Sequence, residues 1–582
     1  MYFPMDLKQN PTGKNDIDEE RERREEMLEE LRDGVGSSDV ECDEGEECDA
    51  SPSPELEALL PYYNQVENEA LKVAKKHFTG TFVADSRDVH NQKLFEYELH
   101  GHIFRCYVDI YNENKDEINI IEVKATTNRK FIGAKDKAIL DRFSEVGKYP
   151  HDLAFQRFVI GNALRLAGEK RQVNYYLAVL NCEYVYDGAK DTGGHRVYDK
   201  IEEQEIIIFL PMNEITETYQ PIILDEINEL ERFISKPHDV SIRTRIGKHC
   251  AWGKNMECVF WKYCFQTLRN VPDYNSANKY LYSHKSFMDK GIVGKYELIE
   301  AGKYSLLDVK EEWLKSENHK IQRRCCAKDK EHVDAEKMQY WLDKIEYPIY
   351  HFDFESFPCP LPRFPGETPY RQSVFEFSLH IERAPGVCDK YHDNFIFLNE
   401  NCDDDEREEL AKAIIDHFEF NEDGTLKGTM LAQNTNFERD RLGELAVLFP
   451  EYAEKLLAIR DKSADLIDLL KTKEAFYKDA FGKKRAKIIN YYHPKLSGSY
   501  SIKKTLPVLV PALTYDGMDV GNGVQAYITY LNYDSKVPTY FDTDKKKVMT
   551  TKSERRDALK TYCQQDTWAM VEILRAIREK VI

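Results

Sequence analysis

From Leu56 onward, hydrophobic and polar positions recur along the chain with the periods of helices and strands. Apolar residues at helical spacing are followed by runs of alternating apolar and polar residues, then by a helical stretch and a further strand-like run. The predicted elements are a helix at 56–77, strands at 95–100, 102–110 and 118–125, a helix at 152–167 and a strand at 174–180. This order predicts an α/β domain over residues 56–268.

A second α/β pattern begins at Tyr347, and residues 269–345 before it are predicted to be a mainly helical connector. The pattern predicts strands at 347–355 and 373–382 and helices at 404–418, 436–449 and 553–581. A second α/β domain is therefore expected over residues 346–582. A chain of 582 residues is too long for one ordinary core, which agrees with two domains.

Residues 1–55 differ from both predicted domains in composition and charge. The net charge of the chain is −21, of which −14 falls on residues 1–60. Such a segment cannot bury a core, so we expect a disordered, solvated acidic tail in preference to a docking segment or a nucleic-acid mimic. The remaining charge of −7 argues against a broad basic binding face. It does not exclude a nuclease, because bound cations offset clustered carboxylates.

Composition also limits where the protein is expected to act. No apolar run reaches the length of a membrane span, and the N-terminus lacks the apolar core of a signal peptide. We therefore expect a cytoplasmic protein with no membrane partner. The 13 cysteines are spread over 582 residues, which favours free thiols or metal ligands over a disulfide scaffold.

The predicted strand around Asp353 and Glu355 places two carboxylates on one face, because side chains alternate along a strand. Neighbouring carboxylates repel each other near a core unless a cation lies between them. A solvent-facing acidic strand edge is the alternative explanation, and the pair alone does not exclude it.

Two predicted helices each add a carboxylate on an apolar face. Glu438 has the phase of Leu442, Leu445 and Phe449, whereas Asp440 falls on the polar face. Asp566 lies on the stripe formed by Leu559, Tyr562, Met570 and Ile573. Salt bridges to Lys or Arg would satisfy each acid separately, but divalent metal ions would satisfy all four carboxylates together.

These residues resemble the three motifs of the DnaQ-like (DEDD) 3′–5′ exonucleases, which have an RNase H-like fold. The motifs are Asp353-Phe-Glu355, Asn434-x-x-Phe437-Glu438 and Tyr562-x-x-x-Asp566, the last resembling the tyrosine-containing subclass. The region 345–582 also resembles an uncharacterised bacterial domain family with a DEDD-type core. The sequence departs from the exonuclease pattern at Glu438, where the second motif usually has Asp.

The resemblance implies two-metal phosphodiester hydrolysis with Mg²⁺ or Mn²⁺ ions roughly 3.5–4 Å apart. Asp353 would bridge both ions, while Glu355, Glu438 and Asp566 would complete their coordination. Tyr562 would orient the attacking water. Lys503 and Lys504 begin a predicted helix, where contact with phosphate and simple solvation remain equally open interpretations.

The N-terminal domain contains a second group of polar residues on predicted buried elements. Asp109 ends one strand, the next carries Glu122-Val-Lys124, and Gln156 lies on the following helix. Two acids and a lysine at one point suit a metal ion together with a cation that stabilises a phosphorane. Glu-x-Lys is common on exposed strands, but the apolar residues around this one predict a buried strand.

This arrangement over residues 56–265 resembles the PD-(D/E)XK nucleases, specifically the RecB-like branch. The resemblance implies one or two Mg²⁺ or Mn²⁺ ions held by Asp109 and Glu122, with Glu69 as a further acid. The branch's Gln-x-x-x-Tyr motif is half present, since Ile160 occupies the tyrosine position.

Three cysteines near the end of this domain follow the spacing C-x7-C-x5-C: Cys250, Cys258 and Cys264. They resemble the C-terminal cysteine cluster of iron–sulfur members of the RecB-like branch, which implies a [4Fe–4S] cluster. Zn²⁺, or no metal at all, is the alternative, because Cys42 and Cys48 in the acidic tail are the only upstream candidates for a fourth ligand.

The sequence thus predicts a fusion of a PD-(D/E)XK restriction-endonuclease-like domain and an RNase H-like exonuclease domain. The expected substrate is nucleic acid, with DNA favoured over RNA. Two alternatives are kept: a binding or scaffolding protein with one degenerate nuclease site, suggested by Glu438 and Ile160, and an RNA-processing exonuclease.

Overall fold

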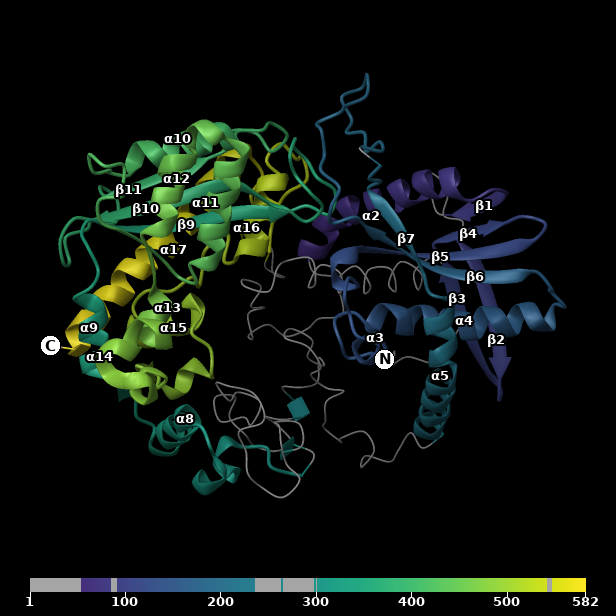
Figure 1. Cartoon of the computed structure of the whole chain (residues 1–582), viewed down its shortest axis with the longest axis horizontal. Helices are drawn as coiled ribbons and strands as arrows, with labels where there is room; N and C mark the ends of the chain where they lie inside the picture. Colours follow the sequence, from purple (N-terminus) through teal and green to yellow (C-terminus); the bar gives the residue numbers. More distant parts are fainter. Residues whose placement is uncertain are drawn as a thin grey trace.

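The computed structural model describes residues 54–84, 92–201, 203–235, 263–264, 298–299, 301–541 and 547–581. The fold is mixed α/β, with two separate five-stranded sheets that occupy the two halves of the molecule (Figure 1). The predicted acidic tail, and most of the segment that carries the cysteine spacing, lie outside the described residues. Within the described part of the chain, no helix has the length and apolar character needed to cross a membrane.

The N-terminal sheet has the strand order β1-β4-β5-β6-β7, in which β5 and β6 are parallel and the other pairs are antiparallel. Its strands are β1 (Thr81–Ala84), β4 (Ile110–Glu113), β5 (Glu117–Thr127), β6 (Gln172–Leu180) and β7 (Ile207–Pro211). One face packs against α2 (Pro54–His77), and the other is covered by α4 (Lys148–Leu166) and α5 (Asn213–Ile234). Strand β5 is buried on both faces, which explains why apolar residues occur at both its odd and its even positions.

The strand predicted at 102–110 is in fact two strands that meet at Asp109. β3 (His102–Val108) pairs with β2 (Lys93–Leu99) in a separate hairpin, whereas β4 pairs with β5. The chain changes partner at Asp109, and hydrophobic alternation cannot reveal a change of partner because it continues through the break. The break places Asp109 beside the middle of β5.

The C-terminal sheet has the order β11-β10-β9-β12-β13, with β9 antiparallel to β10 and parallel to β12. Its strands are β9 (Ile349–Pro358), β10 (Gln372–Glu382), β11 (Asn394–Leu398), β12 (Thr429–Ala432) and β13 (Ser463–Asp465). On one face, Tyr350, Phe352 and Phe354 of β9 pack in one core with α10 (Arg407–His417), α11 (Asn436–Leu448) and α12 (Ala453–Asp461). The long helix α17 (Lys552–Val581) crosses β9 and β10, and its packing against Ile349 places it on the opposite face.

The described part of the predicted connector is helical and shares a core with the C-terminal domain. Its helices α8 (Glu317–Lys328) and α9 (Ala335–Leu342) pack with α17 and with the segment that follows β13. This segment comprises α13 (Leu466–Leu470), α14 (Glu474–Ala486) and α15 (Ile502–Leu509), and its strand β14 (Tyr491–Tyr492) pairs with β8 (His332–Val333).

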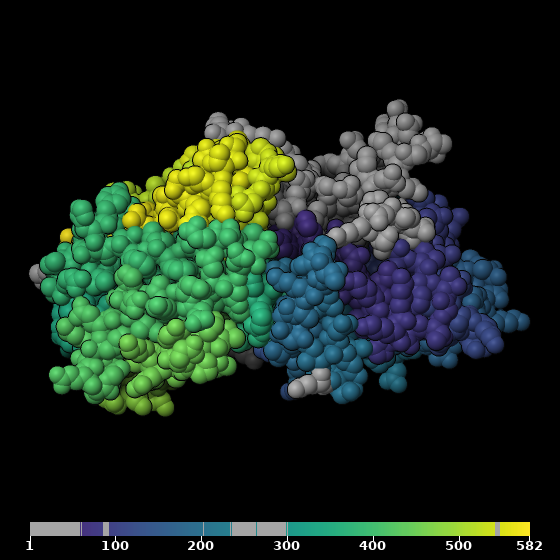
Figure 2. Space-filling model, turned by 90° about the horizontal axis from the view of Figure 1, so that it is seen from above, coloured from purple at the N-terminus to yellow at the C-terminus, as the bar shows by residue number. Residues whose placement is uncertain are grey.

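The two halves are joined by a buried apolar interface. α16 (Gly523–Leu531) packs against α2, and the rings of Phe357 and Tyr62 lie 5.3 Å apart. The Tyr198 hydroxyl donates a hydrogen bond of 2.9 Å to the Pro362 carbonyl, and the Tyr370 hydroxyl donates to the Ala125 carbonyl at the end of β5. Figure 2 shows the green-to-yellow C-terminal half in contact with the purple-to-blue N-terminal half.

Candidate functional site

Strand β9 and helix α17 bring three potential metal ligands to one point in the C-terminal domain. Asp353 and Glu355 each offer a carboxylate oxygen, and Cys563 offers its sulfur, all within 4.8 Å of one another. Glu355 and Cys563 are buried, while Asp353 is half-buried. The two carboxylates share a face of the strand, as alternation along the sequence predicted. In the structure this is the face toward α17.

Asp566 belongs to the same cluster and is held by a tyrosine that the sequence analysis did not identify. The Tyr515 hydroxyl donates a hydrogen bond to Oδ1 of Asp566. Burial, then the charges of Asp566, Asp353 and Glu355, raise the pKa of Tyr515 well above its ordinary value. Tyr515 therefore stays protonated and remains a donor to the acids around it.

Tyr562 lies in the same electrostatic environment, one helical turn before Asp566. Its side chain is buried, and its pKa is raised well above the ordinary value by burial and by the nearby charges of Asp566 and Glu355. The structure thus brings together four of the five residues predicted from the exonuclease motifs.

The fifth residue, Glu438, lies in the first turn of α11, close to where the chain leaves the sheet. β12 runs parallel to β9, with Leu431 opposite His351, and ends one residue later at Ala432. Both oxygens of the Asp465 carboxylate accept hydrogen bonds from backbone amides of this connection, 3.0 Å from Asn434 and 3.1 Å from Thr435. These two hydrogen bonds fix the start of α11.

The helix phase predicted for Glu438 agrees with the structure. The Glu438 side chain is 3% exposed, whereas Asp440 is exposed to solvent. Lys503 and Lys504, for which phosphate contact and solvation were both left open, are half-buried in the first turn of α15.

Glu376 is a further acid next to this cluster, and sequence analysis missed it. It pairs directly with Glu355 across β9 and β10, is fully buried, and neither of its carboxylate oxygens has a hydrogen-bond partner among the described residues. Burial, together with the charge of Asp566, raises its pKa well above the ordinary value despite Lys560 and Arg556. Glu376 therefore favours its protonated form.

Cys563 was missed for a different reason. Burial, then the charges of Glu376, Glu355, Asp353 and Asp566, raise the pKa of its thiol well above the ordinary value. The signal was present in the sequence, because Cys563 precedes Asp566 by three residues and so lies on the same helix face. Cysteine is not a preferred ligand of Mg²⁺, however, so a buried cysteine on this face is interpreted from sequence as an ordinary thiol.

Thr567 positions the helix that carries Asp566. Its hydroxyl lies 2.8 Å from Oγ of Ser378 and 2.7 Å from Nδ1 of His380, both fully buried on β10. Burial lowers the pKa of His380 to about 4, so the ring is neutral at pH 7 and can take part in either hydrogen-bonding role.

We expect Thr567→Val to lower the free energy of unfolding by about 1–3 kcal/mol, because buried hydrogen bonding is lost beside Asp566. Thr567→Ser should retain the stability of the wild type, since it keeps the hydroxyl. Thr561→Val on the exposed face of the same helix is the matched control. Thermal unfolding would contradict this role if the Thr567→Val and Thr561→Val variants had equal midpoints.

The N-terminal domain forms a second polar cluster on the α4 face of β5. Nζ of Lys124 lies 2.9 Å from Glu122 and 3.0 Å from Asp152, while Nε2 of Gln156 donates to Glu122 at 2.7 Å. Glu122, Lys124 and Gln156 are at most 5% exposed. Burial raises the pKa of Glu122, which Lys124 partly opposes. Asp152 was not predicted, although it lies one turn before Gln156.

Asp109 adjoins this cluster through the backbone of β5. One of its carboxylate oxygens accepts a 2.8 Å hydrogen bond from the Val123 amide, and the other accepts one of 3.1 Å from Gln92. The structure therefore groups Asp109, Glu122, Lys124 and Gln156 around one stretch of β5. Glu69, the proposed further acid, lies on α2 and forms an ion pair with Lys72.

The predicted cysteine cluster lies mostly outside the described residues. Outside the described residues lie Cys250, Cys258, Cys42 and Cys48. Cys264 is half-buried and forms no disulfide with another described residue. The [4Fe–4S] cluster and the alternative Zn²⁺ site therefore remain predictions. Ile160, at the position of the expected tyrosine, is fully buried in the apolar core of the N-terminal domain.

Part of this site lies in a segment that is similar to known proteins. Residues 350–501 match a domain of unknown function, DUF2779, a segment that includes Asp353, Glu355 and Glu438 but ends before Tyr562. The chain is 28% identical over 258 residues to the "Uncharacterized protein UU173" of Ureaplasma parvum serovar 3. The aligned region covers 41% of this chain and 32% of that relative. No solved structure matches the chain.

Proposed function

We propose that the C-terminal domain is a metal-dependent nuclease that hydrolyses phosphodiester bonds of DNA or RNA from the 3′ end. The observation that carries the proposal is the convergence of Asp353, Glu355 and Asp566, with Tyr562, from two separate elements. The strand order, with the acidic strand β9 between an antiparallel and a parallel neighbour, also resembles that of RNase H-like nucleases.

The residues present fit a hard divalent cation. Carboxylate oxygens are the preferred ligands of Mg²⁺ and Mn²⁺, and clustered buried acids are costly without a compensating charge. Asp353, Glu355, Asp566 and Glu438 would hold the ions, which would supply Lewis-acid activation and neutralise charge at the phosphate. The Cys563 thiol, held protonated by its surroundings, would adjoin the site without competing as a thiolate.

The other residues of the site have roles that follow from their protonation. Tyr515 holds one oxygen of Asp566 and so orients that carboxylate. Tyr562 remains protonated at neutral pH, which allows its hydroxyl to donate a hydrogen bond to a water molecule or to a phosphate oxygen. Burial of these groups strengthens their interactions with a charged substrate.

We further propose a second nuclease site around Asp109, Glu122, Lys124 and Gln156. Two acids would bind a divalent ion, and the lysine would stabilise negative charge on the reacting phosphate. One observation favours the alternative that this domain only binds or scaffolds. Lys124 is already paired with both Glu122 and Asp152, so the cluster also satisfies itself as a structural ion-pair network.

End-labelled single- and double-stranded DNA and RNA, incubated with Mg²⁺ or Mn²⁺, test both sites. We expect wild-type protein to shorten single-stranded DNA from its 3′ end and EDTA to abolish the reaction. Absence of cleavage on every substrate would refute the enzyme proposal, and cleavage restricted to RNA would identify the RNA-processing alternative.

A pair of variants tests the contribution of the N-terminal domain. Glu122→Gln should lower the rate of cleavage at the N-terminal site by at least about 100-fold, since a metal ligand is lost. Cleavage at the C-terminal site should not change. Glu96→Gln, which alters an exposed ion pair with Arg105 in the same domain, is the control. A cleavage pattern unchanged by Glu122→Gln would leave the N-terminal domain with the scaffolding role.

A further inference from the structure

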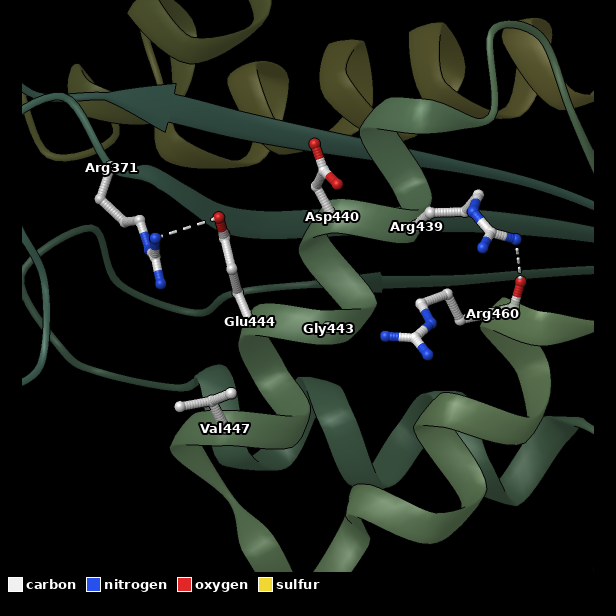
Figure 3. Close-up of a pocket in the computed structure, with 7 residues that line it drawn as sticks. All are labelled: Arg371, Arg439, Asp440, Gly443, Glu444, Val447 and Arg460. Carbon is white, nitrogen blue, oxygen red and sulfur yellow. Dashed lines mark hydrogen bonds and ion pairs between the residues drawn. The ribbon is translucent and has the colours of Figure 1, made fainter.

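A hollow of about 380 Å³ lies on the outer side of α11, the helix that carries Glu438 on its buried side. Figure 3 shows Arg371 pointing to Glu444, and Arg460 reaching from α12 toward Gly443. The hollow is lined by Arg371, Arg439, Asp440, Gly443, Glu444, Val447 and Arg460.

The three arginines that line this hollow exceed its two carboxylates, Asp440 and Glu444. Glu444 is held in a bidentate pair by Arg441, with both distances 2.7 Å, and Arg371 also contacts it at 3.2 Å. One carboxylate therefore faces two guanidinium groups. Arg460 pairs only with its exposed sequence neighbour Asp461 among the described residues, and surface pairs of this kind are weak.

Arg439 is held in place without neutralising its charge. Its Nη1 donates to the Arg460 carbonyl at 2.6 Å and to Oγ of Ser463 at 2.7 Å. Both acceptors are uncharged, and among the described residues Arg439 forms no ion pair. A fixed guanidinium with free donors loses little conformational entropy when it binds an anion.

Gly443 leaves the floor of the hollow open. A Cβ atom at this position would lie 3.7 Å from Nη1 of Arg460, which is ordinary contact distance, so a larger side chain would extend into the hollow. A glycine inside a helix costs about 1 kcal/mol relative to alanine. The helix therefore has a glycine at this position despite its cost, and the space between the arginines stays open.

We propose that this hollow binds a backbone phosphate of the nucleic-acid strand whose end occupies the carboxylate site, an inference that rests on the proposed function. Guanidinium groups bind phosphate through paired N–H donors. An α-helix is about 10 Å across, so the hollow lies within a few nucleotides of Glu438 on the opposite side of α11.

Arg371 links the hollow to the other acids. The next residue, Gln372, accepts a 2.7 Å hydrogen bond from Ser356, which adjoins Glu355. A strand crossing from the carboxylates to the hollow would thus follow the connection between β9 and β10.

The matched variants Gly443→Glu and Gly443→Gln distinguish the effect of an added negative charge from the effect of filling the hollow. The two side chains have the same size, and both favour a helix. Binding of a fluorescent 12-nucleotide single-stranded DNA is measured by anisotropy in EDTA, using full-length protein that also carries Asp353→Asn. We expect Gly443→Glu to weaken binding about 10-fold and to reduce the salt dependence by about one phosphate contact. Gly443→Gln should remain within about 2-fold of the Asp353→Asn parent, because it adds no charge.

Three results would overturn the proposal: no binding of the oligonucleotide by the Asp353→Asn parent, equal weakening by both variants, or no weakening by Gly443→Glu. Displacement of the oligonucleotide by inorganic phosphate at equal phosphate concentration would also overturn it, as it would reveal a site for free anions.

Cleavage assays keep this test distinct from that of the nuclease itself. Hydrolysis of a dinucleotide, which is too short to reach the hollow from the carboxylates, is measured on the wild-type protein and tests the nuclease site alone. If wild-type protein cleaves but Gly443→Glu binds normally, only the phosphate site is refuted. If binding responds to charge but no substrate is cleaved, only the nuclease proposal is refuted.

Discussion

Asp353→Asn is expected to lower the rate of the proposed phosphodiester hydrolysis at the C-terminal site by at least about 10³-fold, equivalent to about 4 kcal/mol of transition-state stabilisation. Asp353 lies within 4.8 Å of Glu355 and Cys563, at the centre of the acids contributed by β9 and α17. Asparagine keeps the size of the side chain but removes the charge that would bind the cations. Initial rates on 3′-labelled single-stranded DNA measure the loss.

In the absence of metal, the same substitution should not lower the stability of the protein. Removing one charge from a buried cluster relieves repulsion with Glu355, so the thermal midpoint in EDTA should stay equal or rise. Addition of Mn²⁺ should raise the midpoint of the wild type by preferential binding to the folded state, and should raise that of Asp353→Asn less.

Asp416→Asn, on the exposed face of α10, is the control, because it removes a carboxylate far from the cluster in the same domain. An inactive Asp353→Asn protein that still gained the full Mn²⁺ stabilisation would place the metal elsewhere. A fully active one would refute the assignment of the site.

The residues of this site that could be predicted are those whose placement depends on their neighbours in the sequence. Alternation along β9 and helical phase in α11 are local, so the inward direction of Glu355 and Glu438 and the exposure of Asp440 followed from sequence. Tyr562 and Asp566 were linked by their spacing of one helical turn.

The residues that were missed reach the site through tertiary contacts. Glu376 lies opposite Glu355 only because β10 pairs with β9 in one register, and a shift by one residue would turn it to the other face. Tyr515 follows α15, 51 residues before Asp566, with no periodic pattern to join them. Neither the strand register nor the path of the segment after α15 is encoded in local periodicity.

The fold shows the same limit. The long elements with strong patterns were predicted within a few residues, as for α17 and β10. Short strands such as β12 and β13 were not predicted, because three or four residues are too few to establish a period. These strands nevertheless decide the topology, since they are the parallel neighbours that set where α11 begins.

Glu382→Gln is expected to destabilise the C-terminal domain by about 3 kcal/mol, because it removes the charge of a fully buried carboxylate from its ion pair with Arg578. Glu382 lies at the end of β10 and is 0% exposed. One of its oxygens lies 3.1 Å from Nε2 of His351, which is also fully buried, and Arg578 of α17 pairs with both oxygens. The substitution would leave Arg578 without a charged partner in this network.

A control is available at the neighbouring surface. Glu419→Gln alters an exposed carboxylate that pairs with Arg383 and Lys427, and should cost no more than about 1 kcal/mol. Thermal unfolding at pH 7 should therefore show a midpoint lowered by roughly 6–12 °C for Glu382→Gln and by little for Glu419→Gln. Equal midpoints for the two variants would contradict a structural role for the buried network.

The dependence on pH provides an independent check of the cause. Burial alone would raise the pKa of Glu382, but hydrogen bonds from His351 and Arg578 outweigh it and lower the pKa to about 2, from an ordinary value of 4.5. A carboxyl group with a depressed pKa stabilises the fold fully above its unfolded pKa and loses this contribution as the pH falls through the folded value. The difference in midpoint between wild type and Glu382→Gln should therefore be constant above about pH 5 and shrink between pH 4.5 and 2. A difference that persisted unchanged at pH 2 would show that packing, and not the charge of Glu382, holds β10 against α17.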